Sequence, residues 1–200
     1  YIGMFGISEV LASEYPENAK VIFLPTQAAK DSAVVEKAIQ SLNKGAKLIL
    51  TTGFLAHARG GEKLAELAQI KWPLKETNVV TRLVDDNGVK TPLEFPIAMD
   101  YQLTPDKATA LLQGGDEAKD VLLTQNEKKN ITVVNIHTFS QQDFDAVGEV
   151  LLSPRQLGLL EVQSWANTIR QAFHDEGMPE LNAPTRITFQ YLNDGNFVVH

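Results

Sequence analysis

Residues 20–55 constrain the fold most, because they have the pattern of a strand, a helix and a second strand. A short apolar run at 21–25 precedes an amphipathic segment with apolar residues at helical spacing, and a second apolar run at 47–52 follows Gly45. Two strands joined by a helix in this way pair in parallel, with a right-handed crossover. Both runs are continuous rather than alternating, so we expect a sheet that is buried on both faces.

Small polar residues follow each of these two expected strands. Thr26 and Gln27 follow the first, and Thr51, Thr52 and Gly53 end the second. In an open α/β sheet, ligands bind beyond the carboxyl ends of the strands, so these five residues are candidate ligand-binding residues. The alternative is that they form only turns and helix caps, which use the same residue types.

Further along the chain, the pattern predicts short helices, hairpins and one long helix. We expect a turn at 54–61 and a brief helix at 62–68. Asn87-Gly88 readily takes positive φ at both central turn positions, which predicts an inserted hairpin between 79–84 and 89–98. The apolar runs 121–124 and 131–136 predict a second antiparallel pair.

The C-terminal part combines the clearest helix start with a closing hairpin. Ser153 and Pro154 suit the N-cap and first position of a helix that should run to about Asp175. Alternating segments at 185–192 and 196–200 predict a hairpin.

We expect two structural parts. The first is an α/β domain over residues 1–182 that lacks its first strand, and the second is the start of a β-rich domain at 183–200. The chain opens inside a motif and closes inside a strand, so we expect a fragment of a longer polypeptide.

Composition excludes several functions. The 200 residues are 44% apolar and 22% charged, which suits one sizeable globular domain. A net charge of -7 argues against nucleic-acid binding, and no stretch approaches the roughly 18 apolar residues of a membrane span. The absence of cysteine excludes disulfides, thiolate metal sites and cysteine nucleophiles.

Few residues have a pattern typical of catalysis. The four histidines are scattered without metal-ligand spacing, and we expect neither a metal nor a cofactor. His137 is a weak candidate general base and ligand contact, because it follows the expected strand 131–136 and would then lie near Thr52. The alternative is a hydrogen-bonded histidine at a strand end. Trp72, in a loop before Pro73, is free to stack on a sugar, whereas Trp165 has core spacing.

The segments 1–7, 21–25, 45–55 and 64–68, in this order, resemble the class I glutamine amidotransferase-like domain. They resemble in particular the middle, trimerisation-type domain of family 42 β-galactosidases and related bacterial glycan-processing proteins. The resemblance implies a flavodoxin-like or amidotransferase-like α/β fold. Such a fold has an open, mostly parallel sheet with helices on both faces, here with an inserted β-hairpin and a C-terminal β-hairpin.

The chain departs from this family at the catalytic position. Amidotransferases carry a nucleophilic cysteine in the turn after a central strand, where this chain has Thr52-Gly53-Phe54-Leu55. His137 would match the family's catalytic-triad histidine, which comes late in the sequence, but it has no cysteine to activate. Amidotransferase activity is therefore not expected.

Three functions remain open. The first is a non-catalytic accessory or assembly domain of a larger bacterial carbohydrate-active, glycoside hydrolase-like protein. Its expected partners are other domains of the same polypeptide, carbohydrate and a second copy of the chain. The compartment would be periplasmic or extracellular if the parent protein processes glycans. The alternatives are a stand-alone hydrolase or lyase that uses His137 with Thr51, Thr52 or Asp31, and a small-ligand sensor at the strand ends.

Overall fold

The computed structural model describes residues 14–81, 83–84, 90–91, 97–115, 119–135, 163–175, 182–184, 187, 189–191 and 196–199. The expected edge strand before residue 14, His137 and the predicted helix start at Ser153 lie outside these residues.

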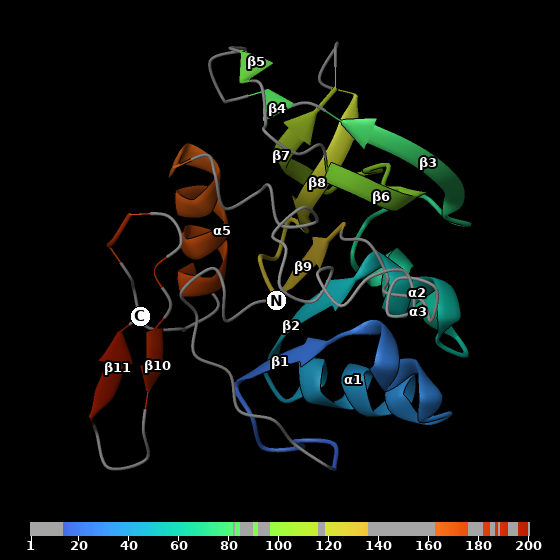
Figure 1. Cartoon of the computed structure of the whole chain (residues 1–200). Coiled ribbons are helices and arrows are strands. Elements are labelled where there is room, and N and C mark those ends of the chain that lie inside the picture. The colour runs from blue at the N-terminus through green and yellow to red at the C-terminus, as the bar shows by residue number, and fades with distance from the viewer. Residues whose placement is uncertain are drawn as a thin grey trace, which may run out of the picture.

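The predicted strand–helix–strand unit is confirmed (Figure 1). Strand β1 (Val21–Leu24) is followed by the 3-10 helix η2 (Thr26–Lys30), helix α1 (Val34–Asn43) and strand β2 (Lys47–Thr51). The two strands pair in parallel, with Leu24 opposite Leu50. After α1, the chain turns at Gly45, whose φ of 91° lies in the left-handed region.

Seven of the described strands form the main sheet, in the order β1-β2-β9-β8-β7-β4-β5. Strand β9 (Ile131–Val134) pairs in parallel with β2. The remaining strands add in antiparallel fashion, as β8 (Asp120–Gln125), β7 (Thr109–Gly114), β4 (Leu83–Val84) and β5 (Lys90–Thr91). The parallel part of the sheet is thus β1, β2 and β9. Short connections between β7, β8 and β9 allow only antiparallel neighbours, because a parallel crossover needs a dozen residues or more.

The predicted inserted and closing hairpins are present, and the predicted antiparallel pair of 121–124 with 131–136 is formed by β8 and β9. The inserted one is β4 paired with β5, and its turn lies outside the described residues. The closing one is β10 (Phe189–Tyr191) paired with β11 (Phe197–Val199). A further two-stranded antiparallel sheet joins β3 (Lys75–Thr81) to β6 (Ile97–Gln102).

Helices cover both faces of the main sheet. On one face α1, α2 (Thr52–His57) and α3 (Gly61–Leu67) pack on apolar side chains of β1, β2 and β9. Helix α5 (Gln163–Asp175) stands on the other side and contacts β7 (Figure 1). Every residue of β9, and all of β2 except Lys47, is buried, as expected for a sheet enclosed on both faces. The fold is therefore of the predicted α/β class: an open, flavodoxin-like sheet with an inserted and a C-terminal hairpin.

Candidate functional site

The carboxyl end of β2 leads directly into a helix. The Thr51 side chain accepts a hydrogen bond from the Phe54 backbone N–H at 3.0 Å and so caps the N-terminus of α2. The predicted turn at 54–61 is wrong in its first half, because this cap starts the helix at Thr52. Thr51 is only 2% exposed, so this bond gives a buried hydroxyl a hydrogen-bond partner.

The ends of β2 and β9 are joined by a buried hydrogen bond between side chains. The Thr52 hydroxyl donates to Oδ1 of Asn135 at 3.0 Å, and both residues are 0% exposed. Nδ2 of Asn135 donates to the carbonyls of Tyr101 at 2.9 Å and Val121 at 3.1 Å, and lies 3.3 Å from Sδ of Met99. This one amide therefore links the strand ends of β2 and β9 to β6 and β8.

Sequence reasoning did not identify Asn135 as a site residue. The available signal was an amide one residue before the end of the mainly apolar run 131–136. A buried polar side chain in such a run has to find hydrogen-bond partners, which marks it for a specific role.

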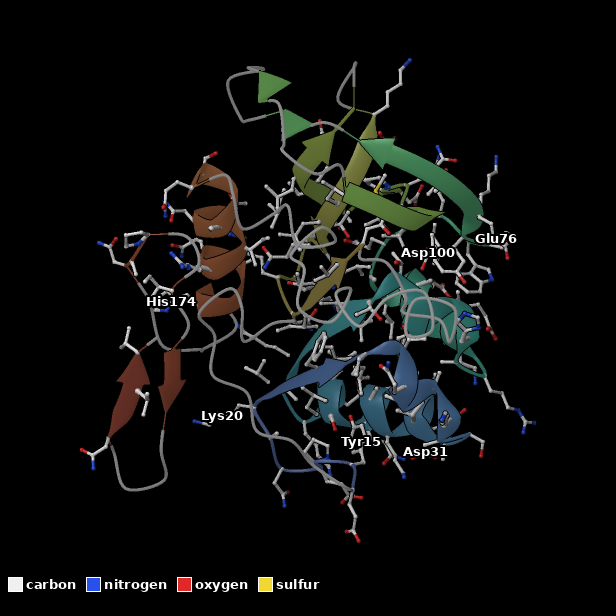
Figure 2. The ribbon with its side chains drawn as sticks, viewed as in Figure 1. Tyr15, Lys20, Asp31, Glu76, Asp100 and His174 are labelled. Atoms are coloured by element: carbon white, nitrogen blue, oxygen red, sulfur yellow. The ribbon has the colours of Figure 1, made fainter. Side chains whose placement is uncertain are left out.

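A histidine and a tyrosine lie together at the far end of α2. Nε2 of His57 is 3.2 Å from the Tyr101 hydroxyl, and the two rings meet edge to face at 76°. Burial raises the pKa of Tyr101, and the carboxylates of Asp100 on β6 and Glu76 on β3 raise it further (Figure 2). The phenol therefore stays protonated in its contact with the His57 ring. This arrangement orients His57 and does not generate a nucleophilic phenolate.

The remaining predicted ligand residues also lie at this edge of the sheet. Thr26 and Gln27 begin η2, which packs against α2, so the structure brings the ends of β1 and β2 together. Thr26 is half-buried and Gln27 is exposed, whereas Gly53 is buried within α2. The prediction that these residues bind a ligand stays a prediction, as does the role of His137.

Asp31, considered above as a partner for His137, has a different neighbour. Its carboxylate forms an ion pair with Lys37 at 2.7 Å on the exposed surface beside α1 (Figure 2). Its described contacts are thus those of a surface ion pair at the start of a helix.

Two further properties concern the described part of the chain. No group of three or more histidine, cysteine or acidic side chains is placed there to hold a metal ion. None of the helices described is both long enough and apolar enough to cross a membrane.

The chain has a distant likeness among solved structures. No protein-family model matches the chain, and no curated protein matches it. Among solved structures, the chain is similar to that of PurLQS from Thermotoga maritima, at 12% sequence identity and a TM-score of 0.43. The similarity covers 82% of this chain and 81% of that one. The fold class stated here rests on the strand order and pairings of this chain, and not on that similarity.

Proposed function

We propose that the chain is a non-catalytic accessory or assembly domain of a larger bacterial carbohydrate-active protein of glycoside hydrolase type. The supporting observation is the bond from Thr52 to Asn135. Thr52 begins the turn, 52–55, that matches the one in which the resembled amidotransferases carry their nucleophile. A nucleophile must be open to substrate and must have a base to take its proton. The Thr52 hydroxyl is fully buried and donates to an amide oxygen, which is not a base at neutral pH.

The other polar groups at the strand ends support the same proposal. Thr51 caps α2, Asn135 joins four strands and Tyr101 orients His57. In this proposal the catalytic residues belong to another domain of the same polypeptide. The present domain contributes contacts to neighbouring domains, to a second copy of itself or to carbohydrate, in a periplasmic or extracellular protein.

The test is made in the native full-length polypeptide, with Thr52→Val and Thr52→Ser. Glycosidase activity is measured on a panel of chromogenic aryl glycosides and expressed per folded molecule. We expect both variants to stay within about twofold of the native protein, because the hydroxyl has no part in the reaction. Thr52→Val should lower the free energy of unfolding by about 1–3 kcal/mol, because the buried Oδ1 of Asn135 loses its donor.

Two results would contradict the proposal. One is a loss of roughly a hundredfold or more in Thr52→Val while Thr52→Ser stays active and both remain folded. The other is a similar loss in His137→Ala, which would favour a stand-alone enzyme with its site near Thr52 and His137. A rise in melting temperature with a small molecule, abolished by substitution of Thr26 or Gln27, would instead support the sensor alternative.

A further inference from the structure

A groove lies beside α3, outside the strand-end site. Its volume is about 570 Å³, within the roughly 300–1,000 Å³ typical of small-ligand pockets. Six of its lining residues come from three segments. They are Glu62 and Glu66 of α3, Gln69 and Trp72 of the segment after it, and Asp106 and Lys107 before β7.

Backbone hydrogen bonds fix the two loop segments of this groove to each other. The carbonyl of Gln69 accepts the backbone N–H groups of Asp106, Lys107 and Ala108, at 2.9, 3.1 and 3.2 Å. The N–H of Lys71 donates to the carbonyl of Thr104 at 2.8 Å. The groove is therefore formed before any ligand arrives, which lowers the entropy cost of binding.

The Gln69 side chain also bonds the groove to the turn after β8. Gln69 has a φ of 58° at the position just after α3, where a helix usually ends with glycine. Its Nε2 donates to a carboxylate oxygen of Glu127 at 2.6 Å, and its Oε1 accepts the Glu127 backbone N–H at 2.7 Å. A glycine would relieve the backbone strain but would lose both bonds. The residue present therefore keeps the turn after β8 attached to the groove.

Trp72 gives the groove an exposed aromatic surface. The residue is 41% exposed, although a large aromatic side chain is usually much more buried. The flat apolar face of an indole fits the C–H face of a pyranose ring, and burying it there removes apolar surface from water. The carboxylates and ammonium groups that line the groove can accept from and donate to sugar hydroxyls.

The charges of the groove favour a neutral ligand over a charged polymer. Acidic and basic side chains both line it, so it has no strong field of one sign. The chain as a whole carries a net charge of -7, which repels nucleic acids and acidic polysaccharides.

We propose that this groove binds a neutral oligosaccharide, with one pyranose ring stacked on Trp72 and its hydroxyls bonded to Glu66, Asp106 and Lys107. The proposal deepens the proposed function, since it names the site by which the domain would hold carbohydrate. It does not require any chemistry at Thr52.

Calorimetric titration tests the site with five neutral tetrasaccharides of β-1,4-linked glucose, xylose, mannose or galactose, or of α-1,4-linked glucose. The protein is the full 200-residue chain. At least one sugar should bind with a Kd of about 1 mM or tighter, which corresponds to roughly -4 kcal/mol. Trp72→Ala should weaken that affinity tenfold or more, whereas Trp72→Phe should retain most of it. Asp106→Asn should weaken it by a smaller factor.

Leu67→Ala is the matched control. Leu67 is an exposed apolar residue of α3, at 43%, and does not line the groove. Its removal should leave the affinity unchanged, which separates stacking in the groove from general apolar contact. Circular dichroism of each variant confirms that it is folded.

The inference is overturned if none of the five sugars binds at 10 mM, or if a sugar binds equally well to Trp72→Ala. It is also overturned if Trp72→Ala leaves sugar affinity unchanged but weakens association with the rest of the parent polypeptide. The groove would then be an interface between domains. These results are independent of the Thr52 assay, in which a loss of activity would contradict the accessory role and leave sugar binding in the groove unaffected.

Discussion

Asn135 is the residue on which most of the strand-end structure depends. Its amide group accepts one hydrogen bond from Thr52 and donates to the carbonyls of Tyr101 and Val121. Asn135→Asp has the same shape but places an oxygen opposite those two carbonyls and buries a charge. We expect it to lower the free energy of unfolding by roughly 3 kcal/mol or more, measured by urea denaturation.

Thr52→Val provides the comparison for Asn135→Asp. Thr52→Val removes one hydrogen bond from the Asn135 amide without adding a charge. It should therefore lower the free energy of unfolding by distinctly less than Asn135→Asp does. Equal costs for the two variants would mean that the amide donors of Asn135 contribute little.

The ion pair of Asp31 and Lys37 should make the stability of the folded state depend on pH. The bond from Lys37, followed by one from the Ala33 backbone N–H, holds the pKa of Asp31 below its ordinary value of 3.8, and Asp31 in turn raises the pKa of Lys37. A lowered carboxyl pKa stabilises the folded state above the unfolded pKa, and the effect is lost as pH falls through the folded pKa. A raised lysine pKa stabilises it below the unfolded pKa and is lost at alkaline pH.

The difference in melting temperature between the native chain and Asp31→Asn should therefore be constant from about pH 5 to 9 and should shrink below about pH 4. Lys37→Met should show the same acid dependence, because it removes the other partner of the same pair. A difference that persists undiminished at pH 3 would show that Asp31 acts through something other than its charge.

For single residues, the sequence predicts the position in a strand or helix better than it predicts the hydrogen-bond partner. Thr51 and Thr52 are correctly placed at a strand end, because the apolar run before them defines where the strand stops. The bond to Asn135 could not be predicted, since its two residues are 83 positions apart and only the tertiary fold brings them together. The same holds for His57 and Tyr101, which are 44 positions apart.

Among the elements, the contact between α2 and α3 depends on a single glycine. A Cβ at Gly61, the first residue of α3, would lie 2.1 Å from the carbonyl oxygen of Leu55 in α2. We expect Gly61→Ala to force the helices apart and to cost about 2 kcal/mol or more in chemical denaturation.

Gly45→Ala is the control for this effect. A Cβ at Gly45 would meet nothing within 4 Å, but the residue has a φ of 91°. Its substitution should cost only about 1 kcal/mol, from backbone strain alone. If Gly61→Ala proved no more costly than Gly45→Ala, the close approach of the two helices would be readily relieved.

The elements themselves were largely predictable from local signals. Apolar runs, Gly45 and the Asn-Gly turn locate the first two strands, α1 and the inserted hairpin, because these depend on neighbouring residues. Helix α2 was missed, since its start depends on the Thr51 side-chain cap rather than on apolar spacing. The pairing of β8 with β9 was predicted from the runs 121–124 and 131–136 and is confirmed. The place of β4 beside β7 had no signal, because these two strands are far apart in the sequence.

For the whole molecule, Arg170 links α5 to the chain that leads into the closing hairpin. Arg170 is 6% exposed, and its guanidinium donates to the carbonyl of Ala183 and to that of Pro184 at 3.0 Å. These carbonyls lie at the predicted domain boundary, which itself stays a prediction. Arg170→Lys retains the positive charge but loses the planar guanidinium, whose two nitrogens donate to the two carbonyls.

We expect Arg170→Lys to weaken this attachment by about 1.5–3 kcal/mol, as for a hydrogen bond to a charged group. Limited proteolysis at residues 182–184 should then become roughly tenfold faster or more. The control is Gln163→Ala, which removes an exposed bond to the same Ala183 carbonyl at 3.2 Å. Cleavage of Arg170→Lys no faster than that of the control would mean that other contacts hold the segment.

The order of strands in the sheet has a consequence for synthesis on the ribosome. Strand β2 lies between β1, which is made just before it, and β9, which is made about eighty residues later, as the 83-residue separation of Thr52 and Asn135 shows. At a translation rate of about 5–20 residues per second, roughly 4–17 s pass between the two. During that time the edge of β2 that pairs with β9 lacks this native neighbour. The nascent protein therefore passes through a stage in which this edge is open to other chains, and completion of β9 ends that stage.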